Sequence, residues 1–129
     1  MTKNIGDFGE NEAVKFLEEK GLKVLERNYH SKYGEIDIIV KDDKYIIFCE
    51  VKTRKDNTFS KPAEAVDEEK QKKILKTAID YLQLHEDINL QPKFDVIEII
   101  YDDFNCEEKV KLINHIENAF GMEEDFEDF

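Results

Sequence analysis

Hydrophobic residues recur along this chain with two periods, and the longer period predicts helices. From Asp7 to Lys20, Ala13, Val14 and Leu17 follow the three- and four-residue spacing of one helix face. A second helical pattern runs from Pro62 to about Glu86. Its apolar stripe consists of Ile74, Leu75, Ala78, Ile79 and Leu82. The pattern therefore predicts two amphipathic helices.

The remaining apolar segments have the shorter period, or the continuous apolar character, of β-strands. Glu35–Val40 is rich in Ile and Val, and Tyr45–Lys52 is apolar on both faces until its end, as in a central strand. Phe94–Tyr101 is a third clear strand, and Leu22–Tyr29 is a weaker one. The segment Lys109–Phe120 fits either a strand or a short helix. The order α-β-β-β-α-β predicts an α/β fold with a mixed central sheet flanked by helices.

Polar residues occupy positions in two of these strands where apolar residues are expected. Aspartate is disfavoured in strands, yet Asp37 lies between two isoleucines. Alternation places side chains i and i+2 on the same face. One face of the first strand then carries Glu35, Asp37 and Ile39, and the other carries Ile36, Ile38 and Val40. In the next strand, one face carries Ile46, Phe48, Glu50 and Lys52.

The short polar turn between these strands determines how the carboxylates meet. With Asp42-Asp43 as a two-residue loop, Asp37 faces Phe48 and Glu35 faces Glu50. Asp37 and Glu50 are then diagonal neighbours, roughly 7–8 Å apart at Cα. A register slip by an even number of residues keeps the pair on one face, whereas an odd slip separates it.

Two carboxylates on one half-buried face repel each other, and a divalent cation removes that cost. Hard oxygen ligands suit Mg²⁺ or Mn²⁺, which can activate water and stabilise charge at a scissile phosphate. Asp37 and Glu50 are therefore predicted metal ligands. Lys52, on the same face, is predicted to position the attacking water or to stabilise developing negative charge. Glu10 shares the apolar stripe of the first helix, so it is a third candidate metal ligand.

Each of these candidates has a structural alternative. Asp37, Glu50 and Lys52 could form an ion-pair network at a strand end, and Glu10 could be stabilised by the helix dipole. Three supporting candidates also have open roles: the first could be a metal ligand or face solvent at the start of its strand, the second could position a site group or contact a phosphate, and the third could contact a phosphate. They are Glu35, Gln71 and Arg54.

The net charge of −12 is an objection to a nucleic-acid partner, because phosphate binding usually requires a basic surface. The charge is uneven, however. Residues 123–129 carry five of the acids and are expected to be a disordered tail after a single domain at 1–122. Residues 41–76 hold ten Lys/Arg against eight Asp/Glu, which is a net charge of +2. The lysines of the second helix, Lys70 among them, fit a solvated helix face better than a DNA track.

Several other classes of protein find no support in the pattern. No apolar run approaches the roughly 20 residues of a membrane helix, and the first residues contain no apolar signal core, so a cytoplasmic protein is expected. Cys49 lies in an apolar run and is expected to be buried and reduced. His30, His85 and His115 lack the spacing of zinc ligands.

The motifs together resemble a known family, the YraN-type predicted endonucleases of the restriction-endonuclease-like PD-(D/E)xK superfamily. The matching segments occur in order and span roughly residues 6 to 120. They are residues 9–13, Gly21, residues 27–29, 34–39, 48–54, 62–66, 70–71, 94–96 and 115–120.

The resemblance implies an αβββαβ core, as in Holliday-junction resolvases. It implies that Asp37, Glu50 and Lys52 match catalytic positions and that Glu10 is the helix-borne acid of the resolvase-like branch. Ile36 replaces the proline of the superfamily name. By analogy, the family points to a Mg²⁺- or Mn²⁺-dependent endonuclease acting on DNA, on branched or damaged structures, with a homodimer as one arrangement. The alternative is a non-catalytic module of the same fold that binds nucleic acid or a protein.

Overall fold

The structure is a computed structural model that describes residues 4–56, 66–104 and 107–121. The predicted acidic tail, and residues 62–65 at the start of the second predicted helix, lie outside the described residues. The elements, in chain order, are α1 (Ile5–Glu19), β1 (Lys23–His30), β2 (Glu35–Lys41), β3 (Tyr45–Lys55), α2 (Glu68–Leu84), β4 (Gln91–Phe104) and β5 (Glu107–Phe120).

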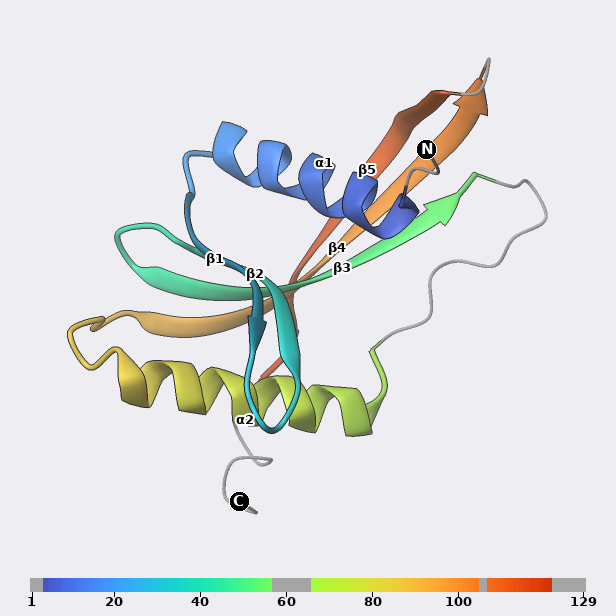
Figure 1. The fold of residues 1–129 in the computed structure, drawn as a ribbon. Helices are drawn as coiled ribbons and strands as arrows, with labels where there is room; N and C mark the ends of the chain where they lie inside the picture. Colours follow the sequence, from blue (N-terminus) through green and yellow to red (C-terminus); the bar gives the residue numbers. More distant parts are fainter. Residues whose placement is uncertain (1–3, 57–65, 105–106, 122–129) are drawn as a thin grey trace.

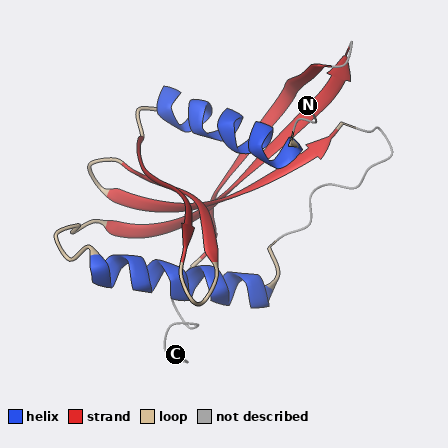
Figure 2. Ribbon diagram, in the orientation of Figure 1, coloured by secondary structure: helices blue, strands red, loops and turns tan. Residues whose placement is uncertain are grey.

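The five strands form one mixed sheet in the order β1-β2-β3-β4-β5. Neighbouring strands are antiparallel except β3 and β4, which are parallel and are connected through α2. Figure 1 shows α1 on one face of the sheet and α2 on the other, and Figure 2 shows the same three layers by element type. The predicted α/β fold with a mixed sheet flanked by helices is confirmed, and it is consistent with a restriction-endonuclease-like core.

The sheet divides the hydrophobic core into two clusters, one under each helix. The cluster on the α1 side includes Phe8, Ala13, Leu17, Ile38, Val40, Ile47, Cys49, Ile97 and Ile99. The cluster on the α2 side includes Ile36, Ile39, Phe48, Ile74, Leu75, Ala78, Tyr81 and Phe94. Burial of apolar side chains on both faces explains why β3 is apolar on both faces along most of its length.

Both helices begin at side chains that cap them. Asn4 accepts hydrogen bonds from the backbone N–H groups of Gly6 and Asp7, at 2.8 and 3.3 Å. Asp67 accepts one from Lys70 N at 2.8 Å. Because Asp67 caps α2, the helix begins at Glu68 and not at the predicted Pro62.

The last segment, which the pattern left open between a strand and a helix, is strand β5. Its register with β4 shifts near Lys111 and again near Asn118, a residue with a positive φ of 52°. Each shift interrupts the alternation of side chains between the two faces. The interrupted alternation explains why the sequence pattern was ambiguous.

The predicted hairpin register is wrong by two residues. Ile38 pairs with Cys49 and Lys41 pairs with Ile46, so the connection is longer than a two-residue loop. The Asp42 side chain stabilises the longer turn, because it accepts hydrogen bonds from the backbone N–H groups of Lys44 and Tyr45, each at 2.8 Å. The slip is even, so the same faces still meet.

The predicted grouping of Ile36 with Ile38 and Val40 is also wrong. Ile36 packs in the cluster on the α2 side, whereas Ile38 and Val40 pack on the α1 side. The change of side occurs at Asp37, whose carboxylate hydrogen-bonds a backbone N–H of β3. The interruption in the alternation therefore coincides with the candidate catalytic residue.

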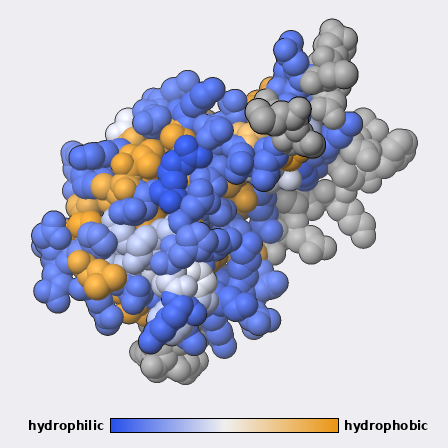
Figure 3. All heavy atoms as spheres, viewed as in Figure 1, coloured by the Kyte–Doolittle hydropathy of each residue, from blue (hydrophilic) through white to orange (hydrophobic). Residues whose placement is uncertain are grey.

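The surface in Figure 3 is largely hydrophilic, and the apolar side chains on this face form smaller patches. Within the part of the chain that the structure describes, none of the helices has both the length and the apolar character needed to cross a membrane.

Candidate functional site

The candidate site lies where β2 and β3 separate. Their pairing ends at Ile38 opposite Cys49. Beyond this point β2 bends with β1 toward α2, while β3 continues beside β4 (Figure 1). A hydrogen bond of 2.9 Å between the hydroxyls of Ser31 and Thr77 links the tip of the β1–β2 hairpin to α2. The divergence leaves a fork between the two strands.

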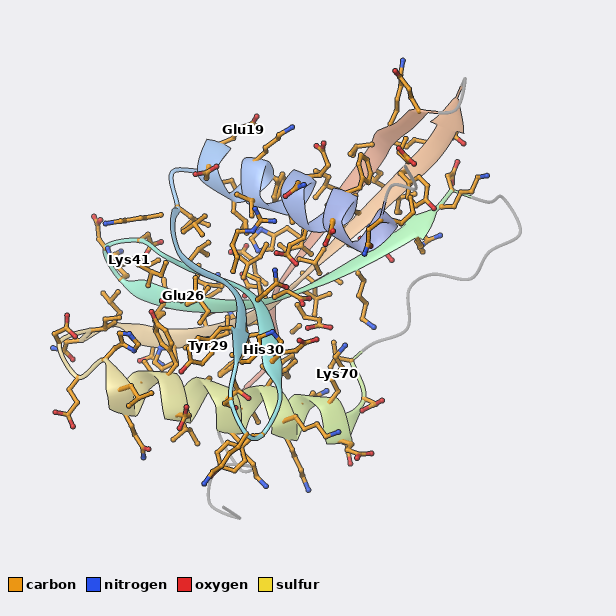
Figure 4. The ribbon with its side chains drawn as sticks, in the orientation of Figure 1. Glu19, Glu26, Tyr29, His30, Lys41 and Lys70 are labelled. Atoms are coloured by element: carbon orange, nitrogen blue, oxygen red, sulfur yellow. The ribbon has the colours of Figure 1, made fainter. Side chains whose placement is uncertain are left out.

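Asp37 and Glu50 meet at this fork. Continuing the register by one residue puts them opposite each other. Asp37 Oδ2 accepts the backbone N–H of Val51 at 2.8 Å, and Glu50 is 7% exposed. Glu50 Oε1 forms an ion pair with the ammonium of Lys70, which extends from the first turn of α2 toward the sheet (Figure 4).

The electrostatics of the fork are those of two carboxylates competing for one cation. Burial and the neighbouring charge of Glu50 raise the pKa of Asp37 to about 7. Partial burial works against the charged form of Lys70, but the hydrogen bond and charge of Glu50 outweigh it and raise the pKa of the ammonium. The structure places a lysine ammonium against Glu50, as in the ion-pair alternative, and the predicted divalent cation at this position stays a prediction.

Glu10 is also buried, at 8% exposure, on the sheet-facing side of α1. Its Oε1 accepts hydrogen bonds from Arg27 Nε at 3.1 Å and from Asn28 Nδ2 at 3.0 Å. Asn28, which has a positive φ of 51°, lies across from Asp37 in the register of β1 and β2. The structure therefore connects Glu10 to the fork through Asn28. The hydrogen bonds and the ion pair that Glu10 forms with described residues all use Oε1.

Lys52 and Arg54 follow Glu50 along the same face of β3. Arg54 Nε donates to Glu98 Oε2 at 3.1 Å, and the other oxygen of Glu98 accepts from Asn114 Nδ2 at 2.8 Å. Lys52 is half-buried and forms no ion pair with any described residue. Arg54 is therefore held by the sheet, whereas the Lys52 ammonium is available to a ligand.

Of the remaining supporting candidates, Glu35 lies beside the fork and Gln71 is engaged elsewhere. Glu35 is exposed, with Oε2 3.4 Å from His30 Nδ1. Gln71 Nε2 donates to Val66 O at 2.7 Å and so fixes the segment before α2. A cleft of about 300 Å³ opens next to the fork. It is lined by Gly34, Glu35, Asp67, Glu69, Lys70, Lys73 and Ile74.

A second group of side chains, on β4 and β5, could also hold a metal ion. Ligand atoms of Asp95, His115 and Glu117 lie within 4.8 Å of one another. The group already has partners, however. His115 Nε2 lies 2.7 Å from Asp95, and its Nδ1 lies 2.8 Å from the ammonium of Lys20. Lys93 lies 2.7 Å from Glu117 and 3.7 Å from Asp95. A metal would have to displace these contacts.

The sequence analysis missed Lys70 and the group around His115. Lys70 precedes Ile74 by four residues, so helical spacing places it at the end of the buried stripe. That spacing was a usable signal. His115 reaches Asp95 only through the pairing of two long strands, and no local pattern reveals such a contact.

A sequence family matches most of this chain. The sequence model of the family described as "Uncharacterised protein family UPF0102" matches residues 9–99, a span that includes the fork, Glu10 and Lys70. The chain belongs to the UPF0102 family. Membership confirms the resemblance to the YraN-type proteins and identifies no activity by itself.

Relatives in this family are similar over nearly their whole length. A UPF0102 protein of Syntrophomonas wolfei is 41% identical over 93% of this chain and 100% of its own. Those of Caldanaerobacter subterraneus and Clostridium botulinum are 44% and 46% identical, over 92% and 93% of this chain and 95% and 96% of theirs. The region of similarity is therefore the whole UPF0102 unit and not a short motif.

Proposed function

We propose that this UPF0102 protein is a Mg²⁺- or Mn²⁺-dependent endonuclease that hydrolyses phosphodiester bonds in DNA, including branched or damaged structures. The observation that carries the proposal is the convergence of Asp37 and Glu50 at the fork of β2 and β3 around a positive charge. A half-buried and a buried carboxylate group at one fork, with an ammonium paired to one of them, fit the ligand chemistry of a hard divalent ion. Membership of UPF0102 and the restriction-endonuclease-like core support the same function.

Each residue has a distinct role in this proposal. Asp37 and Glu50 hold the ion, and the Val51 N–H fixes one Asp37 oxygen so that the other can bind it. Glu10 assists through its second oxygen, directly or through water. When bound, the ion lowers the pKa of a coordinated water and stabilises charge on the phosphate. Lys52 donates to the attacking water or to the phosphate oxygen on which negative charge develops.

The test is cleavage of branched, nicked and single-stranded DNA with Mn²⁺ or Mg²⁺, by the full chain and by Asp37→Asn and Glu50→Gln. Cleavage is expected to fall at least about 10³-fold in both variants while the fold persists, because each removes a charged ligand. The matched control is Asp43→Asn, an exposed carboxylate at the opposite end of the same two strands, which should cut like the wild type. Undiminished cleavage by both site variants would show that the fork is not the active site.

A non-catalytic nucleic-acid- or protein-binding module of the same fold is the second candidate, and the net charge of −12 favours it. Such a module would bind its partner equally well with and without metal. The endonuclease proposal requires metal for productive binding as well as for cleavage, so a comparison in chelator and in Mn²⁺ separates the two.

A further inference from the structure

Lys70 is the lysine of α2 whose ammonium pairs with the buried carboxylate of Glu50. Its ammonium is bonded to Glu50, and the charges of Asp37 and Glu35 also act on it. The Glu50 side chain is 8% exposed, whereas that of Lys70 is 48% exposed. Buried Glu50, which lies beside half-buried Asp37, is thus paired with a cation that reaches it from the solvent side.

We propose that Lys70 is an exchangeable counter-cation: it holds Glu50 beside Asp37 in the metal-free chain and leaves the pair when a divalent ion binds. This inference rests on the proposed function, because it takes the fork to be a metal site. An ammonium and a divalent ion cannot both lie against the same carboxylate oxygen without strong repulsion. Entry of the ion therefore requires Lys70 to move.

The structure allows this movement at low cost. The backbone of Lys70 is fixed in the first turn of α2 by the Asp67 cap, at 2.8 Å. Its long side chain is half-exposed, so the ammonium can return to water by rotation of the side chain alone. Glu50 cannot do the same, because it is buried within a central strand.

The exchange also changes the charge that a substrate meets. In the metal-free chain, Lys70 is neutralised by Glu50 and offers little to a phosphate. After exchange, the divalent ion neutralises the two carboxylates, and the ammonium is free beside the cleft that Lys70 lines. Metal binding would thereby make the fork positive at the step where a phosphodiester has to approach it.

The experiment is a calorimetric titration of Mn²⁺ into the metal-free full chain, into Lys70→Met and into Lys73→Met. Lys73→Met is the matched control, because Lys73 lies three residues along the same helix, lines the same cleft and pairs with Glu69, not with Glu50. Both variants lose one positive charge. Lys70→Met is expected to bind Mn²⁺ about tenfold more tightly than the wild type, since the competing cation is gone. Lys73→Met should stay within about twofold, because solvent screens its charge.

A thermal readout accompanies the titration. Without metal, Lys70→Met should melt below the wild type, because the acidic pair has lost its cation, and Mn²⁺ should raise its melting temperature more than that of the wild type. Equal Mn²⁺ affinity in the two proteins, or weaker binding by Lys70→Met, overturns the exchange and leaves the metal site in place. Absence of binding in every protein overturns both the exchange and the metal-dependent function. Adding Glu50→Gln to each protein should abolish binding and so locate the ion at the fork.

Discussion

The Asp37 side chain replaces a backbone hydrogen-bond acceptor that β2 no longer supplies to β3. Where β2 leaves β3, the Val51 N–H would lose its hydrogen-bond acceptor, and the Asp37 carboxylate provides one at 2.8 Å. The same side chain lies opposite Glu50. A residue that is unfavourable in an ordinary strand is therefore stabilised by the hydrogen bond and positioned for the site at once.

The stability of the metal-free chain should depend on pH through Asp37. Its pKa is about 7 in the folded chain and near 3.8 when unfolded, so the folded chain binds the proton more tightly. The free energy of unfolding therefore falls as pH rises from about 4 to 7, and the loss is complete above the folded pKa. Asp37→Asn removes this loss. At pH 8 in chelator, the variant should be more stable than the wild type by up to about 4 kcal/mol.

Denaturant unfolding of both proteins from pH 5 to pH 8 measures this effect as a difference, which cancels the other titrating groups. Exposed Asp43, changed to Asn, is the control and should give a curve parallel to that of the wild type. A gap between wild type and Asp37→Asn that stays constant with pH would contradict the burial of an ionisable pair at the fork.

At the scale of single residues, alternation together with an assumed hairpin turn predicted that Asp37 and Glu50 meet. The prediction survived a wrong register because the error was an even number of residues. The contact with Lys70 was missed, because it joins a helix and a strand twenty residues apart and depends on the packing of one on the other. The spacing of Lys70 from Ile74 indicates which side of α2 the lysine lies on, but it does not identify Glu50 as the partner of its ammonium.

Among the elements, the docking of α1 on β3 depends on a glycine. A Cβ atom on Gly9 would lie 1.7 Å from Thr53 Oγ1 and 2.8 Å from Thr53 Cβ, so only glycine lets the helix approach this closely. The close packing of α1 on β3 also brings Glu10, the next residue, within hydrogen-bonding distance of Arg27 and Asn28. Close packing of the helix thus sets the position of a site carboxylate.

Gly9→Ala should therefore destabilise the chain and displace Glu10. We expect the free energy of unfolding to fall by about 2 kcal/mol or more, because the clash involves a well-packed strand residue as well as a hydroxyl. Chemical denaturation provides the measurement.

Gly6→Ala is the control in the same helix, since its Cβ would approach only the Asn4 side chain, at 3.1 Å. Its effect should stay within about 1 kcal/mol, because alanine favours the helix. Similar stability of both variants would mean that α1 does not pack on β3 as described.

The elements were predictable where their patterns were regular and uncertain where single side chains interrupted them. Spacing identified both helices and part of their buried faces, and the apolar run identified β3. In α2, however, Ile79 and Leu82 of the predicted stripe are only half-buried, and buried Tyr81 was not predicted. The start of α2 and the turn after β2 were misplaced because each depends on one aspartate, Asp67 or Asp42, that binds nearby backbone. In β5, the register shifts interrupt the alternation of side chains between the two faces, so the strand was not identified from its sequence pattern.

For the whole molecule, the main question is how a chain with a net charge of −12 could bind a polyanion. The acids are not spread evenly, since residues 41–76, which contribute β3 and the start of α2, have a net charge of +2. At the fork itself, however, two carboxylates face one lysine. In the proposed function, a divalent ion offsets the charge of these carboxylates, so the proposal couples the approach of nucleic acid to the binding of metal.

This coupling predicts that nucleic-acid binding itself, and not cleavage alone, requires metal. In chelator, the full chain should show no measurable binding to a labelled branched DNA by fluorescence anisotropy, because non-specific electrostatic attraction is absent at this net charge. With Mn²⁺, at a temperature where cleavage is negligible, binding should appear, and Glu50→Gln should abolish it. Because few lysines contribute, the affinity should fall only shallowly with added salt. Equal binding in chelator and in Mn²⁺ would favour the non-catalytic module, since such a partner surface would have to lie away from the acidic fork.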